Sequence, residues 1–141
     1  MTASLSTFRR AGRSQSGAMA VEFALVFFPL LLLVLGIIEF GRVLYVRNDL
    51  SYAADIAVRN VLIGKIARDA PDIEAQVKLE GAVRDSFDSG DPLLLQVAVS
   101  KETVDGIAFR VLSVRYPFTF FLPGLVESTV SLGLSRRIPI V

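Results

Sequence analysis

The sequence predicts an α+β protein with a long N-terminal helix, one short helix and a small antiparallel sheet of about three strands. An uncharged apolar run near the N-terminus, followed by a stripe of apolar residues at helical spacing, predicts the long helix. A change from helical to alternating spacing after residue 90 predicts the sheet. These patterns divide the chain into four segments, which are residues 1–17, 18–38, 39–68 and 69–141.

The composition limits the classes of function. With 141 residues and 52% hydrophobic content, the chain suits one small domain plus an additional apolar segment. Cysteine and histidine are both absent, which excludes a thiolate nucleophile, disulfides, most zinc sites and the commonest general base. No basic patch is large enough for nucleic acid. We therefore expect no enzyme, no cofactor, no metal site and no nucleic-acid partner.

Residues 1–17 are polar and basic, and we interpret them as a leader that is removed. They hold Arg9, Arg10 and Arg13 and no acid, so their removal would lower the formal net charge from +1 to −2. Positive charges directly before an apolar span keep the N-terminus in the cytoplasm. The rest of the chain is then expected to face the periplasm or the cell exterior, with the protein in the inner (cytoplasmic) membrane.

Residues 18–38 are expected to form a transmembrane helix. Positions 23–38 are sixteen residues without a charge, and the preceding positions extend the run past the single acid, Glu22. Twenty-one helical residues span about 31 Å, which is close to the thickness of one bilayer core. The lipid bilayer is therefore an expected partner, crossed once.

The position of the small residues indicates where the leader ends. A secretory signal peptide is cut after its apolar stretch, whereas Gly17 and Ala18 precede this one. A cut between Gly17 and Ala18 would keep the helix and make it the mature N-terminus. The alternative is a signal anchor whose cytoplasmic tail is never removed.

Glu22 is unusual because it lies inside the apolar segment. A carboxylate within a membrane span costs about 2.5–3.5 kcal/mol on insertion scales. After a cut at Gly17, the ammonium of Ala18 would be a natural partner, in the same chain or in a neighbouring one. Pairing between chains would also set the axial register of adjacent helices. The alternative is that Glu22 lies near the lipid headgroups and has no such role.

Pro29 is expected to kink or loosen the apolar helix. It cannot donate to the carbonyl of Leu25, and its ring crowds that carbonyl. Membrane helices tolerate such a proline when neighbouring groups satisfy the carbonyl.

Residues 39–68 are expected to continue the same helix outside the membrane to about Arg68. Charged residues such as Asp49 and Asp55 fall on the wetter side, and Glu39 and Arg42 are spaced to form an ion pair of little energetic weight. The apolar stripe is largely alanine, so we expect the downstream domain to approach it closely. Its members are Val43, Val46, Leu50, Ala53, Ala54, Ala57 and Val61.

Residues 69–141 are expected to form a small α+β domain. A helix should run from Pro71 to about Ser89, followed by a turn. An alternating run precedes Asp105-Gly106 and a run rich in β-branched and aromatic residues follows it, which predicts a hairpin. In the second run Arg110 and Arg115 fall on opposite faces, so the buried face stays open. Residues 117–124 are expected to be an apolar loop, and 128–141 an edge strand. The acidic residues near the helix lack calcium-loop spacing and favour solvated helix ends.

The segment from Gly17 to Phe23 resembles a known processing site. A glycine, four further residues and then Glu22-Phe23 open a hydrophobic helix, as in the type IV prepilin-like proteins. The resemblance implies that a prepilin peptidase, a membrane-embedded aspartyl enzyme, cuts between Gly17 and Ala18. It also implies that Glu22 and Phe23 serve in assembly.

A closer resemblance extends over roughly residues 12–64. The span AVEFALVFFPLLLLVLGIIEFGR, with its Pro29, is similar to the TadE-like pseudopilins of the tight-adherence pilus system. Two features differ from the major pilins: Ala18 stands where the best-known branch has Phe, and Glu22-Phe23 replaces the usual Glu-Tyr of the tight-adherence branch. Both differences, together with the downstream domain, favour a minor subunit.

The resemblance implies a non-catalytic minor pilin or pseudopilin that acts in assembly of a tight-adherence (type IVb-like) pilus after leader cleavage. The implied partners are the prepilin peptidase, other pilins or pseudopilins and the inner-membrane assembly platform. A second hypothesis is an uncleaved signal-anchored envelope protein whose extracytoplasmic domain binds a partner.

Overall fold

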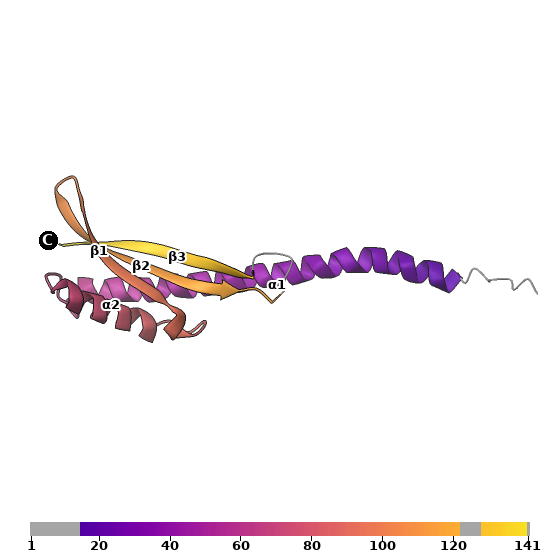
Figure 1. Ribbon diagram of the computed structural model, residues 1–141, viewed down its shortest axis with the longest axis horizontal. Helices are drawn as coiled ribbons and strands as arrows, with labels where there is room; N and C mark the ends of the chain where they lie inside the picture. The colour runs from indigo at the N-terminus through magenta and orange to yellow at the C-terminus, as the bar shows by residue number, and fades with distance from the viewer. Residues whose placement is uncertain (1–14, 122–127, 141) are drawn as a thin grey trace, which may run out of the picture. The chain divides into compact units, whose positions relative to one another are not determined.

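The computed structural model describes residues 15–121 and 128–140, so most of the predicted leader lies outside the described residues. Within them, the element order confirms the predicted α+β class (Figure 1). The elements are α1 (Gln15–Leu62), α2 (Asp72–Asp85), the short 3-10 helix η1 (Pro92–Leu94), β1 (Gln96–Val104), β2 (Ile107–Thr119) and β3 (Thr129–Pro139). The chain divides into two compact units: an N-terminal unit, Met1–Ile38, and a C-terminal unit, Glu39–Val141.

The described part of the N-terminal unit is the first part of α1. Its side chains are almost all exposed, although most of them are apolar. Among the described residues, α1 is the one helix long and apolar enough to cross a membrane. Residues 17–38 span about 33 Å of helix. This segment is therefore compatible with single-pass membrane anchoring.

The C-terminal unit has one hydrophobic core, built on residues 39–62 of α1. The alanines of the predicted stripe, Ala53, Ala54 and Ala57, are fully buried. Leu79 from α2 and Leu112 from β2 are also fully buried, and belong to the same core cluster. The alanine stripe therefore faces this core, and the close approach of the downstream domain to α1 stays a prediction.

Helix α1 ends at Leu62, six residues before the end near residue 68 that the apolar stripe predicts. Gly64 takes a left-handed backbone conformation with a φ of +79°, which glycine adopts at little cost and which stops the helix. The amide of Ile66 donates to the carbonyl of Asn60 at 3.0 Å, and the Ile66 side chain folds back into the core. The expectation of an uninterrupted helix to residue 68 was therefore wrong.

Helix α2 begins after Pro71, as predicted, but it ends at Asp85 rather than near residue 89. The residues that follow bind α1 instead. The Asp49 carboxylate accepts hydrogen bonds from the amides of Asp88 and Ser89, at 2.9 and 2.8 Å. These amides therefore donate to Asp49 of α1 and not to carbonyls of α2, so the helix ends before them.

The three strands form one antiparallel sheet in the order β1-β2-β3. The predicted hairpin is confirmed, since Val104 pairs with Ile107 and both turn residues, Asp105 and Gly106, have positive φ. On β2, Arg110 is buried and Arg115 is exposed, so the face shared by Arg110 is the inner one.

The predicted apolar loop at residues 117–124 begins as strand, because β2 runs to Thr119. Pro117 pairs with Ser131 of β3. On its other side, β1 begins only at Gln96, opposite Arg115, so β2 is an edge strand at Pro117 and tolerates the missing N–H. The side chain of Phe118 is buried, so this segment packs against the core.

Candidate functional site

The predicted processing and assembly residues lie close together near the start of α1. Gly17, Ala18, Glu22 and Phe23 all fall within the helix. Ala18 and Glu22 are four residues apart, so they share one helix face with a rise of about 6 Å between them. The Cα–Cβ bond of a helical residue tilts toward the N-terminus, which brings the Glu22 carboxylate back toward Ala18.

Glu22 is exposed, and among the described residues it forms no ion pair. The side chains around it along the helix are apolar. The described residues therefore supply no counter-charge for this carboxylate, although it lies inside a segment suited to a bilayer. Such a group needs a partner that the described part of the chain does not supply.

Phe23 and Pro29 belong to the apolar surface of the same segment. The Phe23 ring stacks on Phe27, with ring centroids 5.2 Å apart and planes inclined by 16°. Pro29 lies within the continuous helix, where it lines a shallow apolar groove together with Val21, Ala24, Leu25 and Phe28. The groove contains no titratable group. It offers a packing surface, and the predicted kink at Pro29 stays a prediction.

A polar cluster follows directly after the apolar segment. We call Glu39, Arg42, Phe118 and Phe121 the exit cluster. The predicted ion pair is present, with Arg42 Nη1 donating to Glu39 Oε2 at 2.8 Å. The other oxygen, Glu39 Oε1, accepts a hydrogen bond from the backbone amide of Phe121 at 2.7 Å. Glu39 is 8% exposed, so this is a buried carboxylate with both oxygens satisfied.

The arginine of the exit cluster is held by two aromatic rings. Its guanidinium carbon lies 3.7 Å from the ring centroid of Phe121 and 5.0 Å from that of Phe118. The Glu39–Arg42 spacing indicates the ion pair, but no local pattern indicates the contact with Phe121. The only sequence signal for it is an aromatic run, which also suits a small core.

Asp72, at the start of α2, is held by two cations. Lys101 Nζ lies 2.7 Å and Arg110 Nη2 3.6 Å from Asp72 Oδ1. The hydrogen bond from Lys101 is the main cause that lowers the pKa of Asp72 below its ordinary value of 3.8. In the described residues, no group of three or more acidic side chains is placed to hold a metal ion.

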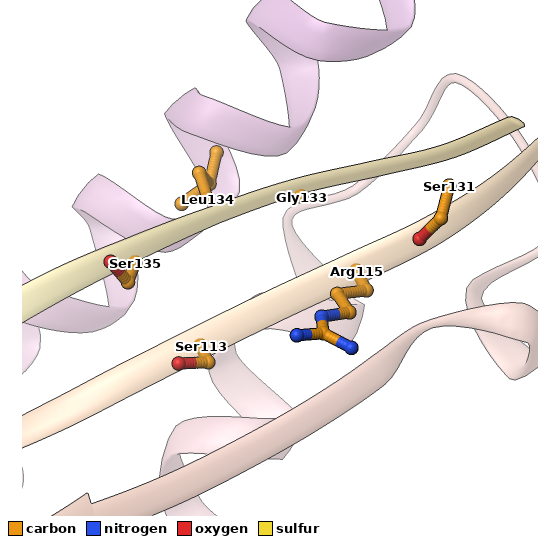
Figure 2. Close-up of a pocket in the computed structure, with 6 residues that line it drawn as sticks. All are labelled: Ser113, Arg115, Ser131, Gly133, Leu134 and Ser135. Carbon is orange, nitrogen blue, oxygen red and sulfur yellow. The ribbon is translucent and has the colours of Figure 1, made fainter.

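The outer face of the sheet carries a polar hollow. Figure 2 shows Ser113 and Arg115 of β2 beside Ser131 and Ser135 of β3, around the bare backbone of Gly133. Arg115 forms no ion pair with any described residue. These groups offer hydroxyls and one cation. The arrangement suits contact with a polar or anionic surface, and it contains no nucleophile paired with a base.

Together these features define a class: a single helix compatible with membrane anchoring that leads into a small α+β unit. Comparison with protein families found a match to part of the chain. The model of the TadE-like protein family matches residues 17–59, so this segment is TadE-like and the resemblance drawn from the sequence is confirmed there. The match begins at Gly17 and includes Glu22, Pro29 and Glu39. It points to involvement with the tight-adherence pilus system. Searches of curated proteins and of solved structures gave no match.

Proposed function

We propose that the protein is a non-catalytic minor pilin or pseudopilin that acts in assembly of a tight-adherence (type IVb-like) pilus. A prepilin peptidase cuts between Gly17 and Ala18. The mature helix then associates with other pilins or pseudopilins and with the inner-membrane assembly platform. The N-terminus starts in the cytoplasm and the C-terminal unit lies in the periplasm or outside the cell. The supporting observation is the order glycine, exposed apolar helix and unpaired Glu22 at the start of a TadE-like segment.

The electrostatics of Glu22 give the proposal its mechanism. In the uncut chain the nitrogen of Ala18 is a neutral amide, and Glu22 has no counter-charge in the described residues. Cleavage turns that nitrogen into an ammonium one helical turn away. In a low-dielectric membrane both charges are costly alone, and each strongly favours an opposite charge nearby. An ammonium and a carboxylate on adjacent helices would satisfy each other and fix the register between subunits.

The cleavage step is tested by the N-terminus of the membrane-purified protein. In cells that contain a prepilin peptidase, N-terminal sequencing and intact mass should give a chain that begins at Ala18. The Gly17→Trp variant should keep its leader, because the side chain obstructs the bond to be cut. A native chain that still begins at Met1 in such cells would refute the proposal.

The assembly step is tested by removing the charge of Glu22. Glu22→Gln keeps the shape of the side chain, and Glu22→Leu also removes the cost of inserting a polar group. Both should show the mass of the variant chain without residues 1–17, and much weaker cross-linking to partner pilins. Glu74→Gln is the matched control, since Glu74 is a solvent-exposed carboxylate paired with Lys78 on α2 and should have no effect. Full pilus assembly by either Glu22 variant would rule out the charge-pairing role.

The second candidate is an uncleaved signal-anchored envelope protein whose C-terminal unit binds a partner. The observation that favours it is the polar hollow around Arg115, which offers an unpaired cation on an exposed sheet face. This function predicts that Gly17→Trp leaves both mass and function unchanged, whereas the pilin function predicts a change in both.

A further inference from the structure

If residues 18–38 span the bilayer core, the sequence fixes the depth of the exit cluster in the membrane. Glu39 is the residue after Ile38, the last residue of the apolar run, so it lies within one residue of the end of the span. The headgroup layer on each side of a bilayer core is about 5–8 Å thick, or one to one and a half helical turns. Glu39 and Arg42 therefore lie at the headgroup layer if residues 18–38 span the core, whichever way the C-terminal unit is oriented.

Phe121 shares this depth because it is bound to Glu39. Its amide donates to the Glu39 carboxylate at 2.7 Å, so its backbone is within one side-chain length of α1 at that residue. Yet the Phe121 side chain is 71% exposed. The Glu39 carboxylate thus fixes the backbone that carries a large, mostly exposed apolar ring, and covering that ring would gain further free energy.

Arg42 adds a charge of the right sign beside that ring. Its guanidinium stacks against Phe121 and binds Glu39 through Nη1 alone, so its remaining donors are not used by any described residue. The side chain is 35% exposed. Two more exposed aromatic residues, Phe40 and Tyr45, lie within two turns of Ile38 on α1. Aromatic rings and arginines with apolar stems are typical of the boundary between acyl chains and headgroups.

We propose that the exit cluster is a bilayer-contact site that anchors the end of β2 to the membrane. The Phe121 ring enters the boundary between acyl chains and headgroups. The free donors of Arg42 face lipid phosphates. The Glu39 carboxylate holds both of them in place. The bilayer is the occupant because Glu39 directly follows the apolar run in the sequence, and because the donors of Arg42 that no described residue uses complement phosphate oxygens.

The absence of tryptophan makes the depth of Phe121 measurable. The full chain with Phe121→Trp, in vesicles of phosphatidylcholine and phosphatidylglycerol, has a single tryptophan. Its emission should be blue-shifted, and most of it should be lost when the vesicles contain lipids that carry a quencher near the headgroup. A quencher deep in the acyl chains should have little effect. Phe40→Trp calibrates the depth, because residue 40 follows the span directly on α1.

Two further variants test the specificity of the contact. Ile107→Trp, at the hairpin turn at the opposite end of β2, is exposed and should show no lipid quenching. Adding Glu39→Gln to Phe121→Trp should reduce the shallow quenching severalfold, since the neutral amide no longer pairs with Arg42. A Phe121→Trp emission that resembles that of Ile107→Trp would overturn the proposal. A blue shift without lipid quenching would also overturn it, because protein would then cover the ring. The purified chain meets no peptidase or pilin in this experiment, so its result is independent of leader cleavage and pilus assembly.

Discussion

Arg110 should stabilise the fold through its buried polar contacts. It is 2% exposed on the inner face of β2. Its Nη2 donates to the carbonyl of Ala70 at 2.8 Å and its Nη1 to that of Arg68 at 3.3 Å. Both carbonyls lie in the segment between α1 and α2, so this cation joins the sheet to the start of α2.

The expected magnitude follows from these contacts. A hydrogen bond from a charged donor contributes about 1.5–3 kcal/mol, and the longer of the two is the weaker. The 3.6 Å contact with Asp72 adds little, because Asp72 is 64% exposed and screened by water. Arg110 Nε is buried without a partner, which offsets part of the gain. Arg110→Met keeps the apolar stem and should lower the free energy of unfolding by about 2–3 kcal/mol, roughly 30-fold to 150-fold in the folding equilibrium.

The assay is urea unfolding of the full chain in detergent micelles, followed by circular dichroism. The midpoint should fall while the slope with urea stays unchanged. Arg115→Met is the matched control, since it makes the same change five residues along β2 on the outer face, where the arginine forms no ion pair with described residues. Its effect should lie within about 0.5 kcal/mol. The reasoning fails if Arg110→Met is as stable as the native chain, as happens when well-packed apolar side chains replace some buried ion pairs.

Three other changes have definite expected outcomes. The pKa of Asp72 is lowered, so its contribution to stability is present above its ordinary pKa of 3.8 and is lost as the pH falls through the folded value. Asp72→Asn should therefore reduce the loss of urea stability in acid. An unchanged dependence of stability on acid pH would contradict the Lys101 contact. Ala57→Leu overfills a fully buried position and should cost about 1–3 kcal/mol in the same assay, whereas no loss would mean that α1 and the rest of the core are not closely packed. Pro29→Ala should keep leader cleavage and membrane insertion but change the efficiency of pilus assembly, and complete loss of insertion would exclude a helix-shaping role.

Local patterns in the sequence were sufficient for the class of fold and for the parts of the site that lie close together along the chain. The apolar run 18–38, whose single charged residue is Glu22, predicts a helix of bilayer length, and the alanine stripe predicts which side of α1 is covered. Asp105-Gly106 predicts the hairpin because few residues accept two successive positive φ angles. The spacing of Gly17, Glu22 and Phe23 indicates the TadE-like segment. Each of these signals lies within one continuous stretch of the chain, so it can be found without knowledge of the tertiary structure.

The tertiary structure decided every feature that depends on residues far apart in the chain. It chose the inner face of β2, because Arg110 donates to carbonyls about forty residues away, whereas no such bond joins Arg115 to a described residue. It gave Asp49 and Asp55, which were expected on the wetter side of α1, hydrogen-bond partners in Ser89 and Arg136. It also joined Glu39 to the amide of Phe121, 82 residues later. A carboxylate takes whichever donor the packed core brings within about 3 Å, and no periodicity in the sequence records that choice.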